Sequence, residues 1–290
     1  MIGHKAWVDT TAQWGNMQSQ IELTIEPRKG WQAIDLREVY FFRELLAFLV
    51  WRDVKIRYRQ TLLGGMWAIL QPVIAMFIFT FVFHRMAGVG SDGAPYPLFA
   101  FAGVSVWTFF ASSVAQASNS LIANHQLVSK TYFPRIFIPL GSIGAFLLDL
   151  LLSLALLALL LVHYRWRVGF ALLELPLFIL GAFLSAAGLG LGLSAINVRF
   201  RDVKYAVPFL LQMGIFVTPV IYPIAYVPKR WQVLVGLNPM AGAVLGFRHA
   251  VLGSPASWSV TGLSLVVSVC LFVGGLLVFR RMEQLFADVI

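Results

Sequence analysis

Cysteine and charge are both scarce in this sequence of 290 residues. The single cysteine, Cys270, lies in an apolar run, so no disulfide can form within the chain and no metal site can be built from several cysteines. Charged residues make up 12% of the chain and hydrophobic residues 59%, whereas soluble domains average about 25% charged residues. The composition therefore predicts an integral membrane protein.

The sequence also lacks the short motifs that carry common enzyme chemistry. It contains no G-x-x-x-x-G-K-[ST] phosphate loop, no H-E-x-x-H, no G-x-S-x-G, and no group of His and Cys at metal-ligand spacing. A membrane transferase would need polar groups converging at one membrane face, and no pair of residues supplies them. We predict that the chain is not an enzyme and binds no cofactor or metal. If ATP drives its function, ATP and Mg²⁺ bind to a separate ATPase.

Long runs with little or no charge recur along the chain. A helix needs about 20 residues to cross the hydrocarbon core of a membrane. Six runs reach or approach that length with at most one charged residue each, and the helix of the last one starts near residue 260: 66–84, 98–124, 136–164, 168–198, 205–228 and 249–279. The pattern predicts an all-α integral membrane protein with six transmembrane helices in each chain.

Lys and Arg are divided unequally between the connections on the two sides of these spans. Eleven lie at 52–59, 130–135, 199–204 and 280–281, and six lie in the connections of the other set. The positive-inside rule therefore predicts a multi-pass protein of the cytoplasmic (inner) membrane with both termini cytoplasmic. The same distribution explains the net charge of +9 without nucleic acid as a partner.

Residues 35–60 form a segment with helical periodicity before the first span. Leu46 and Leu49 fall on one side of this helix and Lys55 on the other. We predict an N-terminal cytoplasmic extension (1–34), then an amphipathic interface helix (35–60), then the six-helix membrane domain (61–290). The alternative for 35–60 is an ordinary polar surface helix that leads into the membrane.

The cytoplasmic connection at 124–139 combines basic and aromatic side chains. Such combinations are typical of protein contact surfaces, because rings bury much area and arginine forms several hydrogen bonds. A separate ATPase would need a docking surface of this kind. The alternative is a basic loop that only sets the topology. The connection includes Lys130, Tyr132, Phe133, Pro134 and Arg135.

The external stretch 222–257 is too long for a simple turn and too apolar for a solvated loop. One short helical pattern follows Pro228, and a second starts with Asn238 as N-cap and ends before Gly253. Neither is long enough to span, so we predict two short outer re-entrant helices that close a pathway. The alternative is two amphipathic helices on the outer leaflet. The residues predicted at this outer gate are Pro228, Trp231, Asn238, Pro239 and Arg248.

Asp149 lies inside the third predicted span, where an ionisable residue is costly and by default a functional candidate. If Asp149 carries a proton, the chain is a proton-coupled secondary transporter, which is the alternative function. If Asp149 is structural, it forms a hydrogen bond to a neighbouring helix. Aromatic residues are dense in the spans. Packing explains most single rings, but together they could line a path for sugars. The rings assigned to this path are Phe77, Phe81, Trp107, Phe110, Phe216 and Tyr222.

Four longer strings in the sequence are more specific than its composition. They are R-D-V-K-I-R-Y-R-Q-T-L-L-G at 52–64 with W-A-I-L-Q-P at 67–72, V-S-K-T-Y-F-P-R at 128–135, N-V-R-F-R-D-V-K at 197–204 with T-P-V-I-Y-P at 218–223, and L-N-P-M at 237–240. In this order they resemble the permeases of polysaccharide ABC exporters over about residues 35–290. The resemblance is to the type-2 ABC permeases that export O-antigen, teichoic acid and related lipid-linked polysaccharides.

The resemblance implies a homodimer bound to two copies of a separate ATPase, with the glycan path between the protomers. Residues 124–135 would be the coupling helix that contacts the ATPase, 37–50 the interface helix and 228–253 the outer gate. The implied substrate is a polysaccharide on a polyprenyl diphosphate carrier within the lipid membrane. We therefore expect Arg57 and Arg59 to meet the diphosphate at the cytoplasmic entrance.

Overall fold

The structure of the chain is a computed structural model that describes residues 42–59, 64–130 and 133–283. Every regular element in these ranges is a helix, which confirms the predicted all-α fold. The predicted extension 1–34 lies outside the described residues. The helices are α2 (Arg43–Tyr58), α3 (Met66–Phe79), η1 (Thr80–Met86), α4 (Tyr96–Ala123), α5 (His125–Lys130), α6 (Phe137–His163), η2 (Phe170–Glu174), α7 (Leu175–Arg199), α8 (Val203–Val217), η3 (Ile224–Tyr226), α9 (Lys229–Gly236), α10 (Pro239–Leu252) and α11 (Trp258–Glu283).

Five of the predicted spans are helices long and apolar enough to cross a membrane, with η1 extending α3 and η2 preceding α7. The span predicted at 205–228 is different, because α8 has 15 residues and ends at Val217. Thr218 leaves the helical conformation (φ −84°, ψ 140°), as a residue before a proline tends to do. Residues 218–228 therefore do not extend α8 as a straight span, and six crossings stay a prediction.

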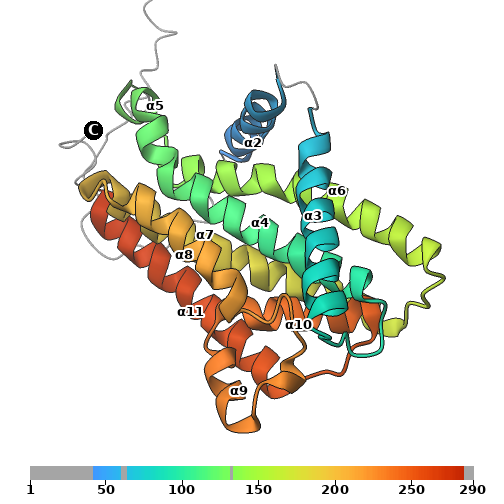
Figure 1. Cartoon of the computed structure of the whole chain (residues 1–290). Helices are drawn as coiled ribbons and strands as arrows, with labels where there is room; N and C mark the ends of the chain where they lie inside the picture. Colours follow the sequence, from blue (N-terminus) through green and yellow to red (C-terminus); the bar gives the residue numbers. More distant parts are fainter. Residues whose placement is uncertain (1–41, 60–63, 131–132, 284–290) are drawn as a thin grey trace, which may run out of the picture. The chain divides into compact units, whose positions relative to one another are not determined.

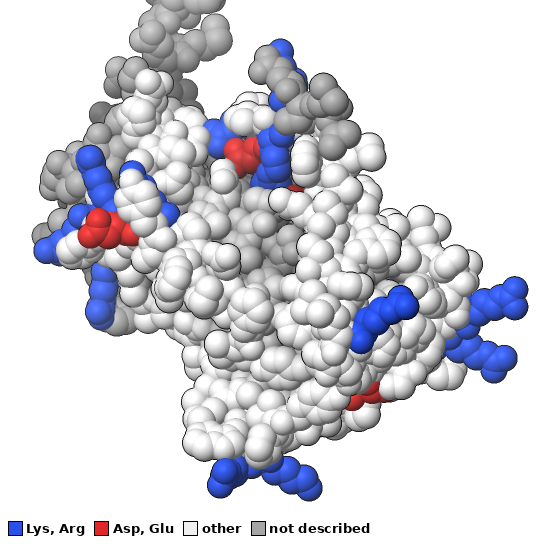
Figure 2. Space-filling model, viewed as in Figure 1, with Lys and Arg blue, Asp and Glu red and all other residues white. Residues whose placement is uncertain are grey.

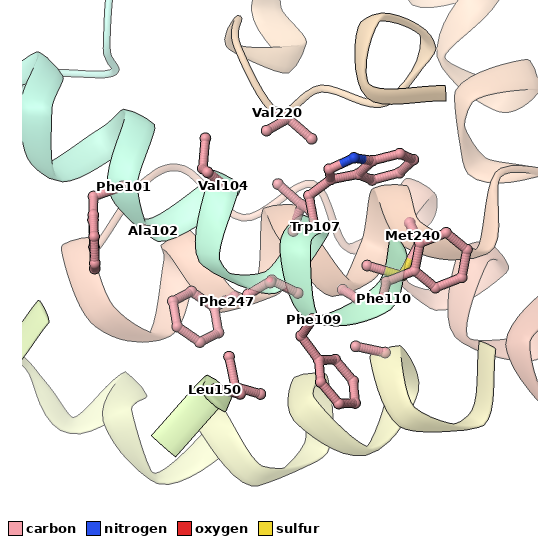
Figure 3. Packing of buried hydrophobic residues seen from close by; sticks show 14 of the residues in the cluster. Phe101, Ala102, Val104, Trp107, Phe109, Phe110, Leu150, Val220, Met240 and Phe247 are labelled. Atoms are coloured by element: carbon pink, nitrogen blue, oxygen red, sulfur yellow. The ribbon is translucent and has the colours of Figure 1, made fainter. Parts of the chain in front are cut away.

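Helix α4 forms the centre of the described unit and packs against α3, α6, α7, α8 and α10 (Figure 1). Its residues Leu98–Phe110 are buried, apart from the half-buried Thr108. Figure 3 shows that Phe101 and Trp107 of α4 belong to the same buried cluster as Phe247 of α10 and Val220 of the segment after α8. Helices α3 and α8, by contrast, expose most of their large apolar side chains. Such surfaces fit contact with lipid or with another membrane protein.

Helices α7 and α11 run side by side over most of their length (Figure 1). Gly188 and Gly275 face each other so closely that a Cβ on Gly275 would overlap the carbonyl of Gly188. The Ser185 hydroxyl of α7 donates a hydrogen bond of 2.9 Å to Ser268 of α11. Small residues at such a contact let helix backbones approach in a membrane, where van der Waals packing drives helix association.

Helix α2 covers part of the predicted interface segment 35–60, of which 35–41 lie outside the described residues. Leu49 is buried, and a Cβ on Gly141 of α6 would lie 3.0 Å from the Leu49 Cβ. Phe48, Trp51 and Ile56 are exposed. Apolar side chains are therefore not confined to one face, because one side of α2 packs on α6 while other sides keep apolar groups for lipid or a partner.

Candidate functional site

Asp149 of α6 is held by two residues from the end of α2. Arg57 forms an ion pair with one carboxylate oxygen at 2.7 Å, and the Tyr58 hydroxyl donates a hydrogen bond to the other. The Arg57 guanidinium also lies 3.5 Å from the centre of the Phe146 ring, a cation–π geometry. A carboxylate in a predicted span thus has a cation and a hydroxyl donor from a neighbouring helix, which agrees with the structural explanation for Asp149.

The same face of α2 contacts α6 at two earlier positions. The Ser142 hydroxyl donates a hydrogen bond of 2.8 Å to Asp53, and Leu49 packs against Gly141. Residues 49, 53 and 57 are four apart, and this spacing places them on one side of a helix. The docking of α2 on α6 therefore places Arg57 and Tyr58 next to Asp149.

A cavity of about 340 Å³ lies beside this ion pair. Its lining combines charged, hydroxyl, amide and aromatic side chains from α2, α3, α4 and α6. Gln71, Thr108 and Ser112 line it with side chains that make no hydrogen bond within the described residues. The lining residues are Arg57, Tyr58, Trp67, Ala68, Gln71, Ser105, Thr108, Phe109, Ser112, Phe146, Asp149, Leu150 and Ser153. Hydrogen-bonding groups without a partner fit a polar ligand or water.

Tyr58 keeps its proton in this site. Burial, together with the hydrogen bond to Asp149, raises the pKa of Tyr58 to about 12. The phenol is therefore a hydrogen-bond donor at neutral pH. Arg57 lines the cavity, whereas Arg59 is exposed beyond the end of α2 and does not line it. The assignment of the two arginines to a cytoplasmic entrance stays a prediction.

The sequence analysis did not select Tyr58, Gln71, Thr108 or Ser112. A signal for the last two was present, because Thr108 and Ser112 are four residues apart in an apolar run and so share one face of α4. Asp149 and Ser153 have the same spacing on α6. Polar residues at helical spacing inside predicted spans would have indicated a polar cavity between the two helices.

The predicted coupling connection begins with α5 and returns to the helical unit at Phe133. Phe133 is buried, contrary to the exposed aromatic surface that we expected. Arg135 donates a hydrogen bond of 3.0 Å to the Glu283 carbonyl at the end of α11. Pro134, between Phe133 and Arg135 in the sequence, is half-buried. Tyr132 and the side chain of Lys130 lie outside the described residues.

The predicted outer pair is present as α9 and α10. Asn238 is the N-cap of α10, with its side-chain oxygen accepting a hydrogen bond of 3.0 Å from the Met240 amide, and Pro239 is the first residue of the helix. Gly253 ends it in the left-handed conformation (φ 67°). Pro228 precedes α9, and Trp231 on α9 is exposed. The two short helices therefore form where the start and stop signals indicate.

Arg248 of α10 is 1% exposed and holds the segment that follows α8. Its guanidinium donates hydrogen bonds to the carbonyls of Phe99 (3.1 Å), Pro219 (2.7 Å) and Val220. The Asn238 amide donates to the Thr218 hydroxyl at 2.8 Å. The carbonyls of Pro219 and Val220, which lie beyond the end of α8, are satisfied in this way, as membrane proteins require. Arg248 is thus a buried structural contact.

The structure does not bring the six predicted pathway rings together. Phe77, Phe81 and Phe216 are exposed on α3, η1 and α8, whereas Trp107 and Phe110 are buried in the core around α4 (Figure 3). Tyr222 is half-buried after α8. Two of these rings thus serve packing within the chain, and three face lipid or a partner.

The fold is that of a helical membrane protein, and its sequence contains no phosphate-loop motif for binding ATP. The family model for ABC-2 type transporters matches residues 44–252. Because the match covers more than half of the chain, this protein belongs to the ABC-2 type transporter family.

Similar proteins align over most of the chain. The O-antigen export system permease protein RfbA of Klebsiella pneumoniae is 27% identical over 252 residues, which cover 87% of this chain and 96% of that protein. RfbA of Myxococcus xanthus is 31% identical over 216 residues, covering 73% and 82%. The polysialic acid transport protein KpsM of Escherichia coli is 27% identical over 245 residues, covering 80% and 91%.

Proposed function

We propose that this chain is the permease subunit of an ATP-driven exporter that moves a lipid-linked polysaccharide, such as O-antigen or a similar surface glycan, across the cytoplasmic membrane. The observation that carries the proposal is the similarity to the RfbA permeases, which covers 87% of this chain and 96% of the Klebsiella pneumoniae protein, and 73% and 82% for the Myxococcus xanthus protein. KpsM, named for polysialic acid transport, extends the similarity to a second glycan exporter. A separate ATPase chain supplies ATP hydrolysis, with ATP and Mg²⁺ bound there.

The cavity beside Arg57 is the proposed contact for the polar part of the substrate at the cytoplasmic entrance. Its rings and hydroxyl groups suit the C–H faces and hydroxyls of sugars. Arg57 uses its NH1 atom on Asp149, and a guanidinium has five N–H donors in all. Donors on the other nitrogens can therefore hydrogen-bond a diphosphate oxygen while the ion pair is kept.

The proposed assembly is a homodimer with two copies of the ATPase, in the inner membrane with both termini cytoplasmic. The exposed apolar faces of α3 and α8 support a membrane-embedded partner, and Phe77 and Phe216 lie on these faces. The coupling region 124–135 is the proposed ATPase contact, with Arg135 linking it to the end of α11. The substrate path then runs between the two protomers.

The alternative, a proton-coupled secondary transporter, would use Asp149 as the proton carrier. The similarity to exporter permeases favours the first function. The geometry agrees, because Asp149 already has an ion pair with Arg57 and a hydrogen bond from Tyr58. These contacts give the carboxylate a structural role in holding α2 against α6.

The test is export in cells that lack this chain. We expect the lipid-linked glycan to accumulate inside these cells and to reach the surface again when the gene is restored. A partner ATPase with its phosphate-loop lysine replaced should give the same accumulation. The proposal fails if no ATP-binding chain co-purifies with the permease, or if export continues with the inactive ATPase and stops when a protonophore is added.

A further inference from the structure

A second cavity, of about 430 Å³, lies in the groove between α7 and α11. Its walls are aliphatic and include Leu193 and Ile196 from α7 with Leu271 and Val278 from α11. A Cβ on Gly274 would meet nothing within 4 Å, so the groove is open at this glycine. Each lining residue comes from α7 or α11, whereas the cavity at Arg57 is built by α2, α3, α4 and α6. The groove is therefore separate from the proposed substrate contact.

Each of the two helices that line the groove has an arginine near its C-terminal end, and these two ends lie at the same end of the groove. Gly181 faces Leu265 and Gly188 faces Leu271, so α7 and α11 run in parallel. Arg199 lies one turn beyond Ile196, at the C-terminal end of α7. Arg281 lies one turn beyond Val278, near the C-terminal end of α11. Residues three apart share a helix face, so each arginine continues the row of side chains that lines the groove.

Two arginines, at the end of α7 and in the turn after it, are exposed to a ligand. Arg199 and Arg201 are exposed, and neither makes an ion pair within the residues that the structure describes. Glu283 forms an ion pair with Arg280 at 3.2 Å. The turn between α7 and α8 contains one acidic residue, Asp202. Figure 2 shows Lys and Arg gathered around this turn. Phe200, exposed between the two arginines, suits the headgroup level of a membrane.

From this arrangement we propose that the α7–α11 groove binds an anionic phospholipid of the membrane. One acyl chain occupies the aliphatic groove, and the headgroup phosphate meets Arg199 and Arg281 at its end. The groove excludes a polar occupant because its walls carry no charged side chain. The arginines select an anionic headgroup over a zwitterionic one, since basic pockets between membrane helices bind anionic lipids.

The test measures which lipid is cross-linked in the groove. The full-length permease is placed in phosphatidylcholine vesicles that contain either phosphatidylglycerol or phosphatidylcholine with a photoactivatable acyl chain, and the labelled peptides are identified by mass spectrometry. We expect labelling in 188–196 and 267–278 to be several-fold greater with phosphatidylglycerol. Arg199→Gln with Arg281→Gln should lower labelling by phosphatidylglycerol toward the level of phosphatidylcholine, a loss of up to about 25-fold, because each charge contributes a factor of about five near a membrane surface.

Two matched controls separate this site from general effects. Gly274→Leu should fill the groove and reduce labelling by both lipids, whereas Gly262→Leu, at another open position of α11, should not. Arg199→Lys with Arg281→Lys should keep the preference. Arg165→Gln with Arg167→Gln, beyond the other end of α7, should not change it. If the Gln pair does not fold, the two single substitutions are tested, each with an expected loss of about fivefold.

Equal labelling of the groove by the two lipids would overturn the proposal, as would a preference that survives removal of both arginines. Equal labelling by the wild type and Gly274→Leu would show that the lipid is not in the groove. None of these outcomes bears on polysaccharide export, which depends on the cavity at Arg57 and on the ATPase.

Discussion

At the scale of single residues, the contacts of buried or half-buried arginines determine what each one does. Arg57 pairs with a carboxylate and also lines a cavity. Arg248 satisfies three backbone carbonyls and is fully buried. The sequence analysis placed both near a pathway. The structure assigns Arg248 to the support of the chain after α8, because a guanidinium with all its partners in the protein has little left for a substrate.

Removing one partner of the Arg57–Asp149 pair should cost more than removing both. Breaking a buried pair costs about 3 to 5 kcal/mol because it leaves an uncompensated charge. This pair is partly exposed (25% for Arg57 and 17% for Asp149), so we expect less than that. Thermal unfolding should show Arg57→Gln less stable than Arg57→Gln with Asp149→Asn. Export should stay low in both variants, because the cation is missing.

Lys55→Gln is the matched control for this comparison, since Lys55 is an exposed basic residue of α2 that does not line the cavity. Its stability and export should match the wild type within experimental error. If the double variant were as unstable as Arg57→Gln alone, the ion pair would not explain why both residues are there. If it exported normally, Arg57 would have no part in substrate contact.

Arg248→Ala should prevent the chain from folding stably. It would leave the buried carbonyls of Pro219 and Val220 without this donor, and each such loss costs about 1 to 3 kcal/mol. Arg230→Ala, on the exposed surface of α9, should stay within about 0.5 kcal/mol of the wild type. The amount of monodisperse protein in size-exclusion chromatography measures the difference. Equal yields for the two variants would contradict the role assigned to Arg248.

At the scale of the elements, sequence patterns predicted helices better than they predicted what lies between them. The spans and the start of α10 at Asn238 follow from local signals, namely apolar length, an N-cap and a proline. Helix α8 was predicted too long because Thr218 and Pro219 end it inside an apolar run. The cavity at Arg57 is lined by four helices, so a local pattern such as Thr108 with Ser112 could indicate a polar helix face but not which helices meet around it.

The packing of α2 on α6 depends on Gly141 and Gly144. A second substitution that restores the space tests this dependence. A Cβ on Gly144 would lie 2.7 Å from a methyl group of Val50, so Gly144→Ala should push α2 away from α6 and weaken the contact of Arg57 with Asp149. Val50→Ala removes that methyl group. We expect export to fall in Gly144→Ala and to recover in the variant that also carries Val50→Ala. Recovery would not follow if Gly144 mattered only for its backbone conformation.

At the scale of the whole molecule, the connection 124–135 and the end of α11 meet through Arg135. A force applied by the ATPase at the coupling region would therefore reach a membrane helix directly. The exposed α3 and α8 lie on the surface of the unit, where a second copy can pack. The sequence predicts a coupling region at 124–135 but could not show this link, because Arg135 and Glu283 are far apart in the chain.

Arg135→Glu should leave the dimer and the ATPase complex assembled but uncouple ATP hydrolysis from export. The substitution puts a carboxylate next to the Glu283 carbonyl in place of a donor, so the link to α11 is lost. Lys204→Glu, another exposed basic residue, should leave the coupling intact. The measurement is ATP hydrolysed per glycan exported. A normal ratio in Arg135→Glu would contradict the proposed path.

The contact of Gly188 with Gly275 has a mechanical consequence. The backbones of α7 and α11 touch here without side chains between them, so sliding one helix along the other would bring a larger residue into the contact and cause a clash. Packed interfaces of this kind are not continuously deformable. We therefore expect α7 and α11 to move as one rigid body in every step of the export cycle. Spin-label distances between the two helices should then stay constant with and without ATP, while those from α7 to α3 change.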